Sequence, residues 1–275
     1  MSNHLIKPNA GKIKYNIDPQ RANWNYLGYQ VLNLKAGDKH SFASNANEAA
    51  IVPLAGKAIA TTAGQSFELK RKSVFIDKPH VLYCPPKHEV IFEAITDCEI
   101  AIGTAPAEGK YPLRLILPSE QKVEVRGGGP AIREVHHTLS HPLPAERLIL
   151  FEVYVPGGMW SGWPPHRHDG INNSPYLEET YHFKFNSKNG FGLHRNYDDE
   201  NNFNEVFAVK DDDLVLVTKG YHPVASAPGN TMYFLNYLAG ELIADERAIP
   251  PVDEEKHAWI KDNWDSYQCE LPLMK

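Results

Sequence analysis

Short runs of apolar, β-branched and aromatic residues recur along the whole chain, and Gly, Pro, Asn and Asp separate them. Many runs alternate apolar with polar positions, which is the period of a β-strand with one buried face. In the first half the predicted strands cover residues 23–34, 49–54, 56–62, 66–69, 73–76, 80–84, 89–94 and 98–104. In the second half they cover residues 147–156, 180–186, 190–197, 205–209, 213–217, 222–225 and 231–239. This pattern predicts an all-β fold, built as an antiparallel sandwich or barrel.

Residues 105–146 separate the two sets of strands and are richer in Pro and Gly. We interpret them as a connector that contains one short strand, residues 121–126. A chain of 275 residues is long enough for one large β domain or for two smaller ones. The recurrence of the strand pattern favours two tandem antiparallel β-barrels, formed by residues 1–120 and 121–275. The charged and aromatic spacing of residues 250–275 predicts a short C-terminal helix.

A cluster of potential metal ligands lies in the second half. His166 and His168 stand at positions i and i+2, so on a strand their imidazoles leave the same face. Glu178 and Glu179 begin a later apolar run, and His222 follows another predicted strand. An isolated pair of this kind is more often two ordinary solvated or core histidines. Three imidazoles with one carboxylate, however, suit a divalent transition metal that keeps positions open for substrate.

The first half has no comparable histidine pair, so we expect its barrel to bind no metal. The net charge is −6, and no Lys/Arg run with interleaved aromatic residues appears, which argues against a nucleic-acid partner. No signal-peptide core and no long apolar window is present, so we expect a cytoplasmic protein without membrane association. Three cysteines without CxxC spacing are typical of free thiols. A homo-oligomer is compatible with exposed β surfaces.

The second half resembles one family at the level of motifs. The matching segments are RGGGPAIREVHH (126–137), LILFEVYVPGGMWSGWPPHRHD (148–169), YLEETYHFKFN (176–186), GFGLHRNY (190–197) and DLVLVTKGYHPVASAPGNTMYFLNYLAG (213–240). With these segments the chain is similar to the 5-deoxy-glucuronate isomerases of bacterial myo-inositol breakdown. The family consists of bicupins, in which two jelly-roll barrels stand in tandem. The long insert between the second histidine and the LEE run is more specific than a general cupin signature.

The resemblance implies a metal site and a reaction. The implied ligands are His166, His168, Glu179 and His222, because only one of the two neighbouring glutamates can face the ion. The implied cofactor is a divalent transition metal, namely zinc, manganese or iron. The implied reaction is an aldose–ketose isomerisation, 5-deoxy-D-glucuronate to 5-dehydro-2-deoxy-D-gluconate, through an enediol.

Proton transfer and recognition of the sugar acid need further residues. The candidates for proton transfer are Glu178 and Tyr181, and Tyr181 shares a strand face with Glu179. The substrate carboxylate needs a cation, for which Arg133, Arg195 and Lys219 lie in or beside the matched segments. Two other readings use the same ligands, a cupin dioxygenase with iron and a non-catalytic cupin that binds a sugar acid. The long insert and the LEE run favour the isomerase.

Overall fold

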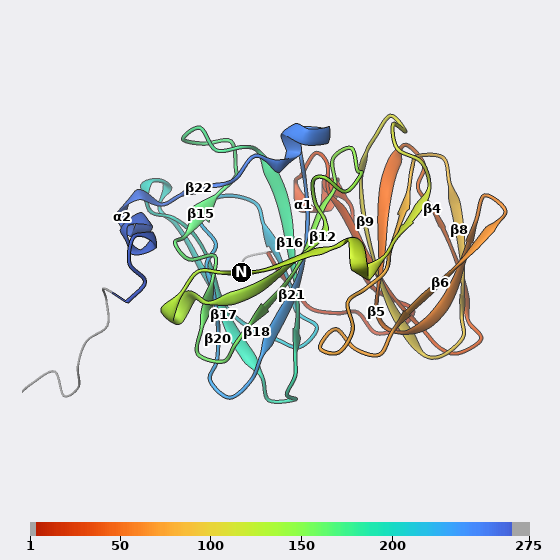
Figure 1. Cartoon of the computed structure of the whole chain (residues 1–275), viewed down its shortest axis with the longest axis horizontal. Helices are drawn as coiled ribbons and strands as arrows, with labels where there is room; N and C mark the ends of the chain where they lie inside the picture. Colours follow the sequence, from red (N-terminus) through yellow and green to blue (C-terminus); the bar gives the residue numbers. More distant parts are fainter. Residues whose placement is uncertain (1–3, 266–275) are drawn as a thin grey trace, which may run out of the picture.

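The computed structural model describes residues 4–265 and consists of two β-barrels that lie side by side (Figure 1). The first half of the chain, red to yellow, forms one barrel, and the green to blue second half forms the other. All strand pairs are antiparallel. The predicted all-β fold with two tandem jelly-roll barrels is therefore confirmed.

The first barrel is built from two walls that share one long strand. Its strands are β2 (Ile13–Ile17), β3 (Gly28–Leu34), β4 (Lys39–Ala43), β5 (Asn47–Thr62), β6 (Gln65–Arg71), β7 (Val81–Cys84), β8 (Glu89–Ala94), β9 (Cys98–Pro106) and β10 (Arg114–Ile116). One wall has the order β10-β7-β5-β9-β3-β2, and the other pairs β5 with β6 and β8, and β8 with β4. β5 passes between the walls at an irregularity between Pro53 and Ala55, where a proline lacks the N–H for a ladder bond.

The second barrel has a large and a small sheet. The large sheet consists of β1 (Leu5–Ile6), β19 (Leu214–Val217), β16 (Leu177–Phe185), β21 (Met232–Gly240), β13 (Ile149–Val155), β12 (Arg133–Leu139) and β11 (Lys122–Arg126), in that order. The small sheet consists of β14 (Trp160–Ser161), β20 (Val224–Ser226), β17 (Phe191–Asp198) and β18 (Phe203–Lys210). In addition, β15 (His166–Arg167) pairs with β22 (Val252–Asp253). We retain residues 1–120 and 121–275 as the proposed division, with β1 as the strand that crosses it.

Helical segments are few and short. The α-helices are α1 (Pro19–Ala22) and α2 (Glu255–Ala258). Single 3₁₀ turns cover Pro118–Glu120, Gly129–Ala131, Asp199–Asn201, Ala244–Ala248 and Trp259–Lys261. The short C-terminal helix predicted from the sequence is thus present as α2. Within residues 4–265, no helix is both long and apolar enough to traverse a lipid bilayer.

The strand prediction fails in a few identifiable places. β2, β4 and β12 were not predicted, and residues 73–76 form a turn instead of a strand. The segment 105–146 is not only a connector, because it contains β12, which pairs with β11 in the same segment and with β13 beyond it. Cys84 and Cys98 are buried free thiols, as expected, and Cys269 lies outside the described residues.

Three apolar layers hold the molecule together. One fills the first barrel, one fills the second, and the third lies between their large sheets, where Tyr29 and Tyr237 are in contact. Gly103 allows this close approach, because a Cβ there would lie 2.0 Å from the Tyr237 ring. The ion pair of Arg71 with Glu152, fully buried, also joins the barrels. The two barrels therefore form one packed unit.

Candidate active site

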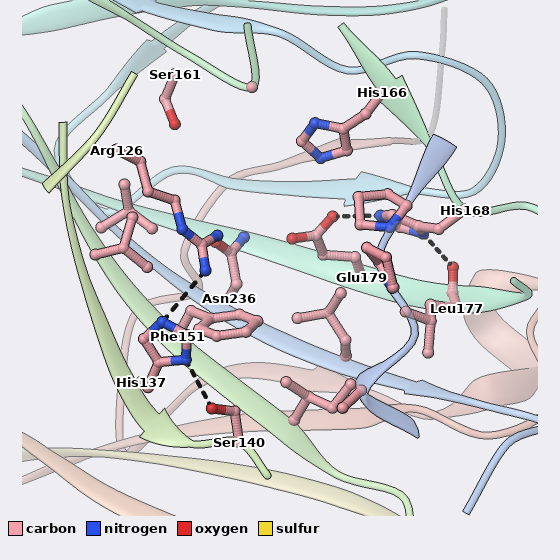
Figure 2. Close-up of a pocket in the computed structure, with 18 of the residues that line it drawn as sticks. Arg126, His137, Ser140, Phe151, Ser161, His166, His168, Leu177, Glu179 and Asn236 are labelled. Atoms are coloured by element: carbon pink, nitrogen blue, oxygen red, sulfur yellow. Dashed lines mark hydrogen bonds and ion pairs between the residues drawn. The ribbon is translucent and has the colours of Figure 1, made fainter. Parts of the chain in front are cut away.

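A cavity of about 390 Å³ lies over the inner face of the large sheet in the second barrel. Strands β11, β12, β13, β16 and β21 contribute its floor, and β14, β15 and residues 247–251 complete its walls. Its volume falls in the range of small-molecule sites. Figure 2 shows the residues that line it, with histidines at one end and Arg126 toward the other.

The strand register determines which side chains share the floor. Residues directly opposite each other on adjacent strands point to the same face. One such row across the sheet consists of Glu179, Leu238 and Ile149. The next row consists of Tyr181, Asn236, Phe151 and His137. The floor thus places a carboxylate and a phenol beside apolar side chains and a more distant imidazole.

His168, Glu179 and His222 form a buried triad at one end of the cavity. Their potential ligand atoms all lie within 4.8 Å of one another. Nε2 of His168 lies 2.9 Å from Oε2 of Glu179, and its Nδ1 lies 2.9 Å from the Leu177 carbonyl oxygen. The backbone contact fixes the ring so that Nε2 faces the carboxylate, and a hydrogen bond at the other ring nitrogen is how proteins orient a histidine that ligates a metal.

His166 lies beside the triad but is not one of the three mutually close residues. Its ring centroid is 4.8 Å from that of His222 and 6.3 Å from that of His168. Figure 2 shows its imidazole facing the same space as the Glu179 carboxylate. Burial first, and then the neighbouring His222 and His168, hold the pKa of His166 well below its usual value. A neutral imidazole is the form that ligates a metal.

The electrostatics of the triad fit a bound cation. Burial alone would raise the pKa of Glu179, but the hydrogen bond with His168 and the closeness of His222 lower it to about 2. The carboxylate in turn raises the pKa of His168, against the effect of burial. Nε2 of His222 lies 3.3 Å from Glu179 without a hydrogen-bond geometry, and is buried without a partner. An unpartnered buried nitrogen aimed at a carboxylate suits a shared metal ion.

Glu178 lies on the opposite face of β16 and does not line the cavity. Its carboxylate accepts the backbone N–H groups of Asn25, Tyr26 and Leu27, and the hydroxyl of Tyr176. These contacts tie the loop before β3 to the second barrel. The structure thus corrects the suggestion that Glu178 carries a proton, because its carboxylate faces the first barrel and is fully engaged there.

Tyr181 does line the cavity, on the same face as Glu179. Its ring packs between His194 and Phe234, with ring centroids 4.8 Å and 4.7 Å away. Burial, and next the charge of Glu179, raise the pKa of Tyr181 well above 10, although Arg133 and a hydrogen bond with Asn236 oppose this. The phenol is therefore protonated at neutral pH and can donate to a ligand.

The three predicted cations have different positions. Arg133 lines the cavity, and its Nε is buried without a partner. Burial first and Arg126 second lower the pKa of Arg133 to about 10. Arg195 lies outside the cavity, where it bonds Asn204 and stacks on the ring of Tyr197. Lys219 is exposed and lies over a phenylalanine ring outside the cavity. Neither of these two residues contacts the predicted site.

Sequence reasoning missed Arg126, His137 and Asn236, which all line the cavity. Nη2 of Arg126 lies 3.2 Å from Nε2 of His137, and its Nε is bonded to Glu124. Arg126 and His137 come from a segment that matched the family, but that was interpreted mainly as a connector. The β alternation of residues 133, 135 and 137 is a signal that could have found His137.

Comparisons with known proteins agree with this architecture. The model of the KduI/IolB family matches residues 3–260. A curated relative from Geobacillus kaustophilus, named 5-deoxy-glucuronate isomerase, is 39% identical over 261 residues, which cover 93% of each chain. A relative of the same name from Bacillus subtilis strain 168 is 32% identical over 272 residues, 94% of this chain and 99% of its own.

Solved structures give the same result. The crystal structure of an IolB-like protein from Salmonella typhimurium LT2 matches with a TM-score of 0.89 and 39% identity, over 94% of this chain and 100% of that one. An oxalate decarboxylase from Bacillus subtilis, at 12% identity, matches 89% of this chain and 79% of its own with a TM-score of 0.63. The latter match shows only a shared bicupin fold. From the matches along nearly its whole length, this chain belongs to the KduI/IolB family.

Proposed function

We propose that this protein is a metal-dependent isomerase that converts 5-deoxy-D-glucuronate to 5-dehydro-2-deoxy-D-gluconate in myo-inositol catabolism. The observation that carries the proposal is a buried histidine–carboxylate triad at a cavity that is also lined by Tyr181 and by three arginines, Arg126, Arg133 and Arg247. The name of the curated relatives supports this substrate. We place the enzyme in the cytoplasm, and a homo-oligomer remains a prediction from the sequence.

The metal site of the proposal consists of His166, His168, Glu179 and His222. A divalent cation held there supplies Lewis-acid polarisation of the substrate carbonyl. The imidazoles favour zinc, manganese or iron over calcium or magnesium. The oxalate decarboxylase from Bacillus subtilis, which shares the bicupin fold, has Mn(II) centres; this supports a divalent metal in the site but does not select among the three.

Tyr181 is the residue we assign to proton transfer between the substrate oxygens. A base removes the proton from C2 as the enediol forms, and the protonated phenol of Tyr181 donates to the carbonyl oxygen in the same step. The phenolate then accepts the proton of the neighbouring hydroxyl while the base returns its proton to C1. These two transfers return Tyr181 to its starting state. The charge of Arg133 lowers the pKa of Tyr181, and so favours the transient phenolate.

Arg133 and Arg126, two of the three arginines that line the cavity, suit an anionic sugar acid. Arg133 has a buried donor with no protein partner, so an oxygen of the substrate can satisfy it. Arg126 is partly exposed toward the cavity and offers a planar guanidinium to a carboxylate. Because the chain as a whole carries a net charge of −6, the positive charge that attracts an anionic substrate has to be local, and these two buried or half-buried guanidinium groups provide it.

The proposal is tested on the purified protein by elemental analysis and by an anaerobic NMR assay on 5-deoxy-D-glucuronate. We expect about one equivalent of zinc, manganese or iron per chain, and conversion to the ketose without oxygen. His168→Gln should lose both metal and turnover. Metal without any turnover of this substrate would refute the assigned reaction, and oxygen-dependent turnover would support a cupin dioxygenase instead.

A further inference from the structure

The end of the cavity away from the triad combines a guanidinium with an aromatic ring. Cζ of Arg126 lies 5.9 Å from the centroid of the Phe151 ring. Glu124 and His137 hold two sides of the guanidinium, and the Oγ of Ser140 lies 2.9 Å from Nδ1 of His137. Figure 2 shows the contacts of Arg126 with His137 and of His137 with Ser140. Arg126 is therefore oriented by its neighbours before any ligand binds.

Part of the floor between this guanidinium and the triad is an apolar cluster. Ile149, Leu177 and Leu238 form one cluster with Phe151 packed against it. None of these four side chains can accept or donate a hydrogen bond.

Asn236, the polar residue next to Phe151 across the strands, is already engaged. Its Nδ2 donates to the Thr180 carbonyl, 3.0 Å away, and the amide also bonds Tyr181. His137, on the other side of Phe151, already bonds Arg126 and Ser140 through its two ring nitrogens. A hydroxyl placed against the Phe151 ring would therefore exchange its water partners for an apolar contact beside donors that are already bonded.

The chemistry of the proposed substrate matches this arrangement, and the following step rests on the proposed function. A 5-deoxy-hexuronate carries its reacting carbonyl at C1 and its carboxylate at C6. The carbon next to the carboxylate, C5, is a methylene group. With C1 and C2 at the triad and the carboxylate at Arg126, the C5 methylene lies at the ring of Phe151.

We infer that Arg126 and Phe151 together recognise the –CH2–COO⁻ end of the substrate, and that Phe151 selects against uronates with a C5 hydroxyl. The selection acts through an unpartnered hydroxyl in an apolar contact, a mechanism that gives discrimination of up to about 10²-fold. Arg126 contributes to the binding of either acid, because both carry the same carboxylate. Phe151 thus determines the specificity at C5, and the neighbouring Arg126 provides affinity for the carboxylate.

The test compares kcat/KM for 5-deoxy-D-glucuronate and for D-glucuronate in two matched variants. D-Glucuronate closes into a pyranose through its C5 hydroxyl, whereas the 5-deoxy acid has no such hydroxyl, so their open-chain fractions differ. That difference belongs to the substrates and is the same for every variant. The informative quantity is the change in the kcat/KM ratio between wild type and variant.

Phe151→Leu keeps the contact apolar, and Phe151→His introduces a polar ring of similar shape. We expect the leucine variant to keep the wild-type ratio, and the histidine variant to shift it toward D-glucuronate by about 10-fold. Arg126→Gln should raise KM for both acids together and leave the ratio unchanged. Thermal unfolding and metal content verify that each variant is folded, and Phe151→Tyr replaces the histidine variant if that one does not fold.

An unchanged ratio in Phe151→His, with the enzyme active on the 5-deoxy acid, would overturn this inference and leave the proposed function standing. The same holds if Phe151→Leu shifts the ratio as much as Phe151→His does. Absence of wild-type turnover of the 5-deoxy acid, with metal bound, refutes the proposed function itself. The two failures are therefore distinguishable within one set of measurements.

Discussion

Glu178 and Glu179 are neighbours on β16 whose carboxylates serve opposite sides of the sheet, so the pair Glu178→Gln and Glu179→Gln separates structure from chemistry. In Glu178, Oε1 accepts from Asn25 N and the Tyr176 hydroxyl, and Oε2 accepts from the N–H groups of Tyr26 and Leu27. A glutamine keeps one of these oxygens and turns an NH2 group toward the other two donors.

Two hydrogen bonds to a charged acceptor are thus lost in Glu178→Gln. Each is worth about 1.5–3 kcal/mol, and the lower value applies because three of the four contacts are only partly buried. The expected loss in the free energy of unfolding is about 3 kcal/mol. For a chain of this size that lowers Tm by roughly 6–12 °C. At a temperature well below Tm, kcat and metal content should equal those of the wild type.

Glu179→Gln should give the opposite result, because it removes the charge from the triad. We expect loss of metal and turnover, whereas Glu178→Gln keeps both at a temperature well below its Tm. Differential scanning calorimetry, metal analysis and the NMR assay measure all three quantities for both variants. A large fall in kcat of Glu178→Gln at unchanged Tm would refute the reasoning, because it would make Glu178 a catalytic group.

Three further predictions address the cavity, the barrel interface and pH. Arg133→Gln should raise KM for the sugar acid by at least about 10-fold. The matched control Arg195→Gln, outside the cavity, should leave kcat and KM unchanged. Equal effects of the two variants on KM would contradict the position of Arg133 inside the cavity and of Arg195 outside it. Arg71→Met leaves the Glu152 carboxylate buried without its cation, so it should lower the free energy of unfolding, measured in urea, by about 3–5 kcal/mol. The double variant Arg71→Met with Glu152→Leu should regain part of this lost stability. Burial lowers the pKa of His194 from 6.5 to about 3. The unfolded chain takes up this proton near pH 6.5, whereas the folded chain takes it up only near pH 3. As the pH is lowered from 6.5 to about 3, His194 should therefore decrease the free energy of unfolding by up to about 1.4 kcal/mol per pH unit. His194→Gln should flatten that slope in pH-dependent melting, and an unchanged slope would contradict the assignment.

Local periodicity was sufficient for the fold class and for the face shared by Glu179 and Tyr181. Both depend on the alternation of side chains along one strand, which the order of residues encodes directly. The same alternation places Glu178 on the other face of the strand. The pattern that identified Glu179 therefore also excludes Glu178 from the site. The insert between His168 and Glu179 did not prevent their contact, because Asp169 and Tyr176 pair as a β-bridge and the turn between them brings the chain back beside His168.

Nearness in sequence misled the choice of cations. Arg195 follows the buried His194, and Lys219 lies close before His222, yet both point out of the cavity. On a strand or tight turn, the neighbour of an inward residue faces outward. Arg126 reaches the cavity from a segment that seemed to be a connector, because β11 extends the large sheet by pairing with β12.

The amino-acid sequence by itself determined the β-rich fold, the histidine spacing and the family resemblance, since these are properties of residue order over short distances. Only the tertiary structure decided which strands become neighbours, and with that the contents of the cavity. The pairing of β12 with β13 brings His137 beside Phe151, and the pairing of β15 with β22 brings the C-terminal segment to the strand of His166. Such contacts join residues far apart in the chain, and their geometry is set by packing and register across the whole sheet.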